Sequence, residues 1–207
     1  MMYATAYFAF RVHARVGPGD TVLVTAASSS AGLGGLHLAK LMGARVIATS
    51  RTREKASRLI EQGADHVIAT DEGLLAERML EITDGRGVQV AYDPIGGAFI
   101  RRYLDGLAEQ ARVFVYGMLG GDPSIEYPIA SVLRRGLSIQ PYSAIPPLAD
   151  ARLREEAKLF LTLALQAGRL APVVDRVFAL EDAVAAYDYM RSGRQFSKIV
   201  MRTRFAD

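Results

Sequence analysis

One stretch near the N-terminus, residues 22–41, limits the possible folds of this chain more than any other. It begins with the apolar run Val22–Val24, which predicts a buried strand. A turn of small residues follows, and leucines at helical spacing then predict a helix that continues to Leu41. A strand, a tight turn and a helix are typical of a dinucleotide-binding unit, because a pyrophosphate must approach the backbone closely and meets free N–H groups at the helix N-terminus.

The match of this turn to the glycine pattern of such units is imperfect. When the pattern G-x-G-x-x-G is aligned with this turn, its three glycine positions correspond to Ala27, Ser29 and Gly32, so only the third is occupied by glycine. Gly32 stands where the helix must pack tightly on its strand, whereas alanine and serine are small but lack the freedom of glycine at positive φ. A small-residue helix start that binds no ligand therefore stays open as the alternative.

Composition and charge narrow the class of protein. The chain has 207 residues, of which 50% are hydrophobic and 23% charged, as expected for one large domain or a domain with an appendage. The net charge of +3 comes with no basic block, so we expect no nucleic-acid partner. The absence of cysteine excludes disulfides and thiolate metal sites. Since the sequence has no long apolar run and no signal-peptide pattern, we expect a cytoplasmic protein with no membrane partner.

The order of elements along the chain predicts an α/β fold. Residues 1–15 predict a buried apolar helix, and since it starts at the first residue without a cap, we hypothesise that the chain is a piece of a longer protein. Five strands then alternate with helices, which predicts a doubly wound parallel sheet that binds ligands at the carboxyl ends of its strands. The predicted strands are residues 22–24, 45–49, 66–69, 88–92 and 112–116, and the predicted helices are residues 33–41, 53–62, 72–83 and 99–109.

The pattern changes after this alternation. Residues 137–142 predict a further strand, whose Pro141 favours the edge of a sheet. The remaining predicted elements are a helix at 151–166, a strand at 173–178, a helix at 181–190 and a strand at 197–201. The last three of these have no obvious place in the doubly wound sheet. We therefore predict a Rossmann domain over residues 1–168, with residues 1–16 as a lead-in helix, and a C-terminal segment over residues 169–207.

The end of the second predicted strand bears on the choice of cofactor. In NAD-binding units a carboxylate near this point hydrogen-bonds the ribose 2′-hydroxyl. Here the strand is followed by Ser50 and Arg51, with Lys55 soon after, and the first carboxylate is Glu54, inside the next helix. An arginine can form two hydrogen bonds to a 2′-phosphate that a carboxylate would repel, so we predict NADP(H) rather than NAD(H). The alternative is a solvated helix start with Thr52 as its N-cap.

Short segments spread over almost the whole chain resemble the medium-chain dehydrogenases/reductases, in particular the quinone oxidoreductase and enoyl reductase branch and the zinc-type alcohol dehydrogenase-like proteins. The segments are Pro18–Asp20, Thr25–Leu33, Gly63–Ile68, Asp93–Gly97, Tyr116–Met118 and Ser197–Val200, in the order of the family. The resemblance implies hydride transfer between NADPH and a quinone, an enone or enoyl group, or a carbonyl. It covers the C-terminal, cofactor-binding part of a family member.

The resemblance also implies which residues bind the cofactor. The turn would hold the pyrophosphate through Ser28, Ser29, Ser30, Ala31 and Gly32, and the adenosine phosphate would lie on Ser50, Arg51 and Lys55. The ribose and nicotinamide would be flanked by Asp93, Pro94, Ile95, Tyr116, Gly117 and Met118, with Lys198 close to the cleft. Two residues depart from the pattern, since Thr70 replaces a tyrosine that many quinone reductases carry and Ser197 replaces a glycine before the closing lysine.

By the same resemblance, family members have an N-terminal GroES-like domain that carries the substrate pocket and, in zinc enzymes, the metal ligands. None of it matches this sequence, and the strands at 173–178 and 197–201 would normally complete it. We therefore hypothesise a fragment that binds the cofactor, is inactive alone, and acts on a small-molecule substrate only together with the missing domain. Family members pair their edge strand across a two-fold axis, so a homodimer through residues 137–142 is expected.

The residues themselves indicate no catalytic acid or base. Asp93 ends a strand at the cleft, but beside Pro94 we expect it to be a turn former whose carboxylate accepts hydrogen bonds from nearby N–H groups. We expect no metal site, and the scattered histidines are expected to pack or to lie on the surface; they are His13, His37 and His66. The alternatives left open are a fragment of a zinc-dependent alcohol dehydrogenase, a non-catalytic NADPH-binding module, and a Rossmann protein that binds a nucleotide sugar or S-adenosylmethionine.

Overall fold

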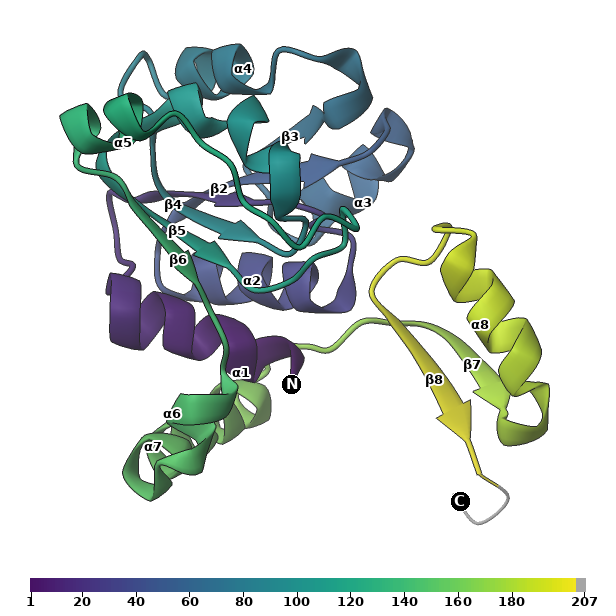
Figure 1. Ribbon diagram of the computed structural model, residues 1–207. Coiled ribbons are helices and arrows are strands. Elements are labelled where there is room, and N and C mark those ends of the chain that lie inside the picture. Colours follow the sequence, from purple (N-terminus) through teal and green to yellow (C-terminus); the bar gives the residue numbers. More distant parts are fainter. Residues whose placement is uncertain (204–207) are drawn as a thin grey trace.

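Six parallel strands form the central sheet of the molecule (Figure 1). The computed structural model describes residues 1–203. The strands are β1 (Thr21–Val24), β2 (Arg45–Ser50), β3 (His66–Ala69), β4 (Val88–Asp93), β5 (Leu107–Val115) and β6 (Ser138–Pro141). Their order in space is β3-β2-β1-β4-β5-β6, and each neighbouring pair is parallel. This order confirms the predicted doubly wound fold, whose strand order reverses between β1 and β4.

Helices cover both faces of the sheet, because successive strand residues point to opposite sides. Val22 and Val24 belong to one hydrophobic cluster, whereas Leu23 between them belongs to another. The first cluster includes residues of α1 (Met2–Tyr7), the π-helix Phe8–Ala14, α2 (Ser30–Leu41), α3 (Ala56–Glu61) and α7 (Ala151–Gln166). The second includes residues of α4 (Leu75–Ile82), the 3-10 segments Gly97–Arg102 and Leu104–Gly106, and α5 (Ile129–Arg135). The predicted burial of the N-terminal helix is confirmed along residues 6–10.

The predicted helix over residues 99–109 is wrong. In its place two 3-10 segments end at Gly106, and β5 begins at Leu107. Gly106 faces α4 at close range, since a Cβ there would lie 2.9 Å from Cβ of Met79, and Leu107 pairs with Val88 of β4. The apolar spacing of this stretch fits a helix, but strand pairing and packing on α4 outweigh the local preference. Helices α5 and α6 (Ile145–Ala149) lie where the sequence predicts no element.

The C-terminal residues form a small unit beside the main sheet. Strands β7 (Val174–Ala179) and β8 (Lys198–Arg202) pair in parallel, and α8 (Ala183–Arg191) lies between them in the chain. Figure 1 shows this unit reaching away from the main sheet, so the last strands are confirmed to have no place in it. Of the predicted segment 169–207, residues 204–207 lie outside the described residues, and its boundary at residue 168 stays a prediction.

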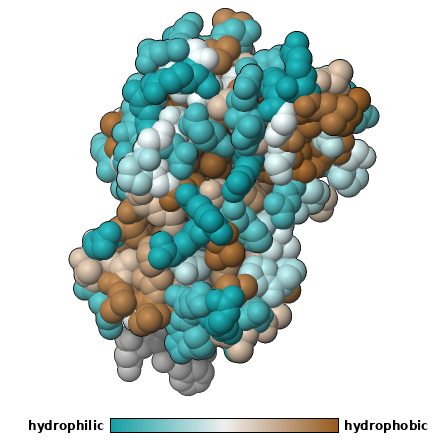
Figure 2. Space-filling view, turned by 90° about the vertical axis from the view of Figure 1, so that its left-hand side faces the viewer, coloured by the Kyte–Doolittle hydropathy of each residue, from teal (hydrophilic) through white to brown (hydrophobic). Residues whose placement is uncertain are grey.

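Strand β6 is an edge of the main sheet, as its proline predicts. Figure 2 turns the left-hand side of Figure 1 toward the viewer and shows brown apolar patches among hydrophilic side chains. Exposed apolar side chains on α5 and α7 include Ile129, Leu133, Leu159 and Leu163. Within residues 1–203, no helix combines the length and the apolar character needed to cross a bilayer.

The packing of α2 on the sheet gives a test of the fold. A Cβ on Gly35 would lie 2.8 Å from two ring carbons of Tyr92, which is fully buried. Because that ring has no room to move, we expect Gly35→Ala to lower the free energy of unfolding by about 1–3 kcal/mol, measured by urea unfolding. Gly17→Ala is the control, since nothing lies within 4 Å of its Cβ position. Equal losses in the two variants would contradict the packing argument.

Candidate functional site

The turn between β1 and α2 is fixed by backbone hydrogen bonds. The N–H groups of Ala27 and Ser29 donate to the carbonyls of Thr49 and Ala26, both at 2.9 Å. Ala26 has a φ of +46°, so the left-handed residue of the turn is an alanine. Neither Ala27 nor Ser29 has a positive φ, and these two positions therefore do not need glycine.

Gly32 lets the start of α2 pack directly on this turn. A Cβ at Gly32 would lie 2.5 Å from the carbonyl oxygen of Ala26 and 2.9 Å from Cα of Ala27, so only glycine fits, as the sequence pattern predicts. Ser29 caps the helix, and its Oγ accepts a hydrogen bond of 3.0 Å from the N–H of Gly32. The predicted pyrophosphate residues 28–32 therefore form a rigid helix start with the positive partial charge of a helix N-terminus.

The buried carboxylate of Asp93 joins the ends of β1 and β4. Its Oδ1 accepts hydrogen bonds from Thr25 Oγ1 at 2.5 Å and from the N–H of Ile95 at 2.8 Å. Its Oδ2 accepts from the hydroxyl of Tyr103 at 2.9 Å and from the N–H of Gly96 at 3.4 Å. Asp93 is fully buried, and its bonds to the two N–H groups are those expected of a turn former.

The chain after β5 is bonded to the chain after β4. The N–H of Tyr116 donates to the carbonyl of Asp93, and the N–H of Leu119 to that of Pro94, each at 2.9 Å. A Cβ at Gly117 would lie 2.7 Å from the Pro94 carbonyl oxygen, so the two turns touch. A pocket of about 400 Å³ opens beside them, and its lining includes Gly96, Tyr116, Gly117, Met118 and Tyr142. Three residues predicted to lie near the nicotinamide thus line a cavity.

Two stacked tyrosines lie at this end of the site, of which Tyr116 lines the pocket while Tyr92 is fully buried behind it. The rings of Tyr92 and Tyr116 are stacked, with their centroids 3.9 Å apart. Burial raises the pKa of both phenols, and the charge of Asp93 raises that of Tyr116 further. Both side chains therefore stay neutral at physiological pH.

The residues predicted to bind the adenosine phosphate lie at and just after the end of β2. Ser50 is buried and Arg51 is exposed. Thr52 precedes the 3-10 segment Arg53–Lys55 without a side-chain cap, so the capping hydrogen bond of the alternative interpretation is not formed. Arg53 forms an ion pair with Glu72.

Sequence reasoning missed a segment that meets these residues, 193–197, which we call the C-terminal strap. The Lys55 ammonium donates to two strap carbonyls, at 2.6 Å to Gly193 and 2.8 Å to Gln195. Burial lowers the pKa of Lys55. The strap lies far from Lys55 in the sequence, and only the closing motif that begins at residue 197 points to this contact.

Most of the predicted site residues meet at one edge of the sheet. The turns after β1, β4 and β5 are bonded to one another, and the N–H of Ser197 donates to the carbonyl of Ser28 at 2.7 Å, which places Lys198 at the same edge. The predicted phosphate residues lie one strand over, beside the end of β2. The arrangement offers backbone N–H groups, a helix N-terminus and cations to an elongated anionic ligand. The role of each residue toward a cofactor stays a prediction.

Comparisons with known proteins show the family of this chain. A model of the family described as zinc-binding dehydrogenase matches residues 31–158. This chain belongs to that family. It is 31% identical to quinone oxidoreductase-like protein 2 from Bos taurus, over 96% of this chain and 57% of the relative. It is 32% identical to 2-haloacrylate reductase from Burkholderia sp, over 95% of this chain and 60% of the relative.

A solved structure agrees with this assignment. Escherichia coli quinone oxidoreductase, determined as a complex with NADPH, superposes with a TM-score of 0.87 at 26% identity, over 97% of this chain and 62% of that protein. The match corresponds to the NADP-binding half of the medium-chain dehydrogenases/reductases. This member of the family thus spans 57% and 60% of the length of its two curated relatives.

The name of the family raises the question of zinc. The chain has no cysteine, and within residues 1–203 no group of three or more histidine, aspartate and glutamate side chains is placed to hold a metal ion. Zinc sites in proteins use three or four such ligands. The described residues do not fit a zinc site, and we assign no step to a metal.

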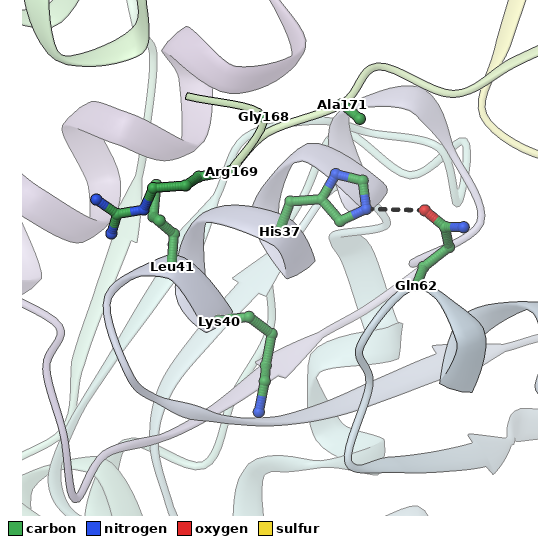
Figure 3. Close-up of a pocket in the computed structure, with 7 residues that line it drawn as sticks. All are labelled: His37, Lys40, Leu41, Gln62, Gly168, Arg169 and Ala171. Carbon is green, nitrogen blue, oxygen red and sulfur yellow. Dashed lines mark hydrogen bonds between the residues drawn. The ribbon is translucent and has the colours of Figure 1, made fainter. Parts of the chain in front are cut away.

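A second pocket, of about 440 Å³, lies between α2, the end of α3 and the segment after α7 (Figure 3). His37 Nε2 donates to Gln62 Oε1 at 3.1 Å, while Nδ1 accepts from the hydroxyl of Tyr3 at 3.2 Å. Figure 3 shows Lys40 and Arg169 extending away from the imidazole. His37 is therefore a packed residue with both ring nitrogens bonded, as predicted.

The bonds of Asp93 predict a large effect on stability. In Asp93→Asn one carboxylate oxygen becomes an NH₂ group that faces donors, so we expect the free energy of unfolding to fall by about 2–3 kcal/mol. Urea unfolding measures the loss. Asp105→Asn is the control, because Asp105 is 80% exposed, and we expect it to change stability by less than about 0.5 kcal/mol. A loss in Asp93→Asn no larger than in the control would show that the four bonds do not stabilise the fold.

The burial of His37 predicts a dependence of stability on pH. Burial lowers its pKa in the folded chain from the ordinary 6.5, while the bond to Gln62 opposes this shift. The unfolded chain then takes up the proton first, so the contribution of His37 is complete above pH 6.5 and is lost as the pH falls below it. We expect His37→Gln to flatten this loss, measured by urea unfolding at pH 7.5 and at lower pH values. His66→Gln controls for removing a histidine elsewhere, and an unchanged slope in His37→Gln would contradict the prediction.

Proposed function

We propose that this chain binds NADP(H) along the carboxyl edge of its sheet, at the switch point between β1 and β4. The observation that carries the proposal is the close packing at Gly32, where a helix N-terminus meets a turn that leaves no room for a side chain. The NADPH complex of the related E. coli quinone oxidoreductase supports the same cofactor. In this proposal residues 28–32 hold the pyrophosphate, and the turns after β4 and β5, with Lys198, flank the ribose and nicotinamide.

The adenosine end of the site supports NADPH over NADH. No carboxylate stands at the end of β2, where NAD-binding units carry one for the ribose hydroxyls. Arg51 is exposed and can form a forked pair of hydrogen bonds with a 2′-phosphate, to which Ser50 and Lys55 add further donors. We propose that these three residues recognise the phosphate that distinguishes NADPH.

The proposed reaction is hydride transfer between NADPH and a quinone, an enone or enoyl group, or a carbonyl. The bound nicotinamide supplies the hydride chemistry, and the protein positions the reactants. The names of the relatives, a quinone oxidoreductase-like protein and a haloacrylate reductase, support this class of substrate. The chain would contribute the backbone around Asp93 and Gly117 as a rigid support and the ring of Tyr116, backed by Tyr92, as part of the pocket wall.

We propose that turnover needs a further domain, because the chain spans only part of each relative. Rapid NADPH-dependent reduction of a quinone or enone by the purified chain would overturn this. Assays in the presence of the further domain distinguish two alternatives to this proposal. Turnover that then requires zinc supports an alcohol dehydrogenase, whereas tight NADPH binding without turnover supports a non-catalytic binding module.

We also propose a homodimer through β6. Strand β6 is the last strand on its side of the sheet, and its outer edge offers backbone groups to a second strand. Light scattering at micromolar concentrations should then give twice the mass of the chain, and a monomer alone would contradict the proposal.

The phosphate site is tested by substituting two neighbouring arginines. We expect Arg51→Ala to weaken NADPH binding by about tenfold to a hundredfold, because a forked charge-assisted pair of hydrogen bonds is lost, and to leave NADH binding unchanged. Titration of nicotinamide fluorescence measures both affinities. Arg53→Ala is the matched control, since Arg53 pairs with Glu72 on the surface. Unchanged NADPH affinity in Arg51→Ala, or a preference of the unaltered chain for NADH, would overturn the assignment.

A further inference from the structure

The C-terminal strap is held across the ends of β1 and β2 by several independent contacts. The Lys55 ammonium donates to two of its carbonyls, and the N–H of Ser197 donates to the carbonyl of Ser28. Phe196 is only 1% exposed, and the guanidinium carbon of Arg58 lies 4.0 Å from its ring centroid. The strap is therefore a fixed part of the edge at which the cofactor is proposed to bind.

Gly193, the first residue of the strap, lies against the guanidinium of Arg51. A Cβ on Gly193 would lie 2.7 Å from Nη2 of Arg51, a distance that real Cβ atoms do not show. Because the atom it meets is the far end of a flexible side chain, an added methyl group would move the guanidinium rather than the backbone. The missing side chain of Gly193 thus leaves the space in which the Arg51 guanidinium lies.

The junction between strap and turn also holds buried polar atoms without a hydrogen-bond partner. Within the described residues these include Ser30 Oγ of α2 and two strap atoms, Gln195 Oε1 and Ser197 Oγ. Buried polar groups are normally bonded, so this junction has unused hydrogen-bonding capacity next to the proposed pyrophosphate residues.

We propose that the strap shapes the cationic adenosine-phosphate site, with Gly193 leaving room for the Arg51 guanidinium and Lys55 holding the strap, and that it thereby sets the preference for NADPH over NADH. The inference rests on the proposed function. Lys55 has two of its three N–H groups bonded to the strap, so it is first a positioning residue and has one donor left for phosphate.

Gly193→Ala tests this against a control of equal backbone strain. Gly193 has a φ of +69° and Gly168 a φ of +67°, but nothing lies within 4 Å of the Cβ position of Gly168. We expect the ratio of NADPH to NADH affinity to fall about tenfold in Gly193→Ala, and to stay within about twofold of the unaltered chain in Gly168→Ala. A general structural defect would lower both affinities together and leave the ratio unchanged, and circular dichroism checks that each variant folds.

Lys55 is tested without nucleotide. We expect Lys55→Met to speed hydrogen exchange at the Ser197 amide, which bonds to the turn, by about tenfold, because the strap opens more often. Lys55→Arg, which keeps a cationic donor, should restore slow exchange.

The outcomes separate the inference from the proposed function. An unaltered chain that binds neither nucleotide overturns the proposed function, and the inference with it. An unaltered chain that prefers NADPH, together with an unchanged affinity ratio in Gly193→Ala, overturns the inference alone. Unchanged exchange at Ser197 in Lys55→Met shows that Lys55 does not hold the strap.

Discussion

The buried carboxylate of Asp93 is the interaction on which the site depends. A charged carboxylate in the interior loses its hydration and is stable only where donors replace the water. Here the donors come from separate stretches, namely Thr25 after β1, Tyr103 between the 3-10 segments, and two N–H groups after β4. The carbonyl of Asp93 also binds the N–H of Tyr116 after β5. The hydrogen bonds of Asp93 therefore fix the turns after β1, β4 and β5 relative to one another.

The parts of the fold that local physics decides could be predicted from the sequence. Apolar runs and small-residue turns predict the parallel strands, and Pro141 predicts the edge position of β6. The stretch 99–109 could not be predicted in this way, because its apolar residues fit a helix in isolation, while pairing of Leu107 with β4 decides its conformation. The same limit applies to the site. The turn at Gly32 depends on neighbouring residues and could be predicted. Lys55 and Arg51 contact a strap that is distant in the sequence, and the residue spacing within either segment does not indicate these contacts.

The turn between β1 and α2 also shows how two of the three glycine positions of the dinucleotide-binding pattern can be occupied by other residues. A glycine in such a turn serves either a left-handed backbone or a close approach. The residue with left-handed backbone here is Ala26. Because neither Ala27 nor Ser29 has a positive φ, both positions can carry a side chain. The close approach remains at Gly32, where the backbone of Ala26 and Ala27 would meet any Cβ. In this turn glycine is retained only at Gly32, where packing leaves no room for a side chain. Ser29, which stands where the pattern has glycine, caps the helix instead.

The strap connects this edge to the C-terminal unit. Strand β8 follows the strap directly, and Arg58 of α3 contacts both Phe196 of the strap and Asp175 of β7. The outer surface of the unit carries exposed apolar side chains such as Val177 and Val184. In the proposed function the strap shapes the phosphate site, so any contact that restrains β8 would also restrain the strap and the Lys55 side chain bonded to it.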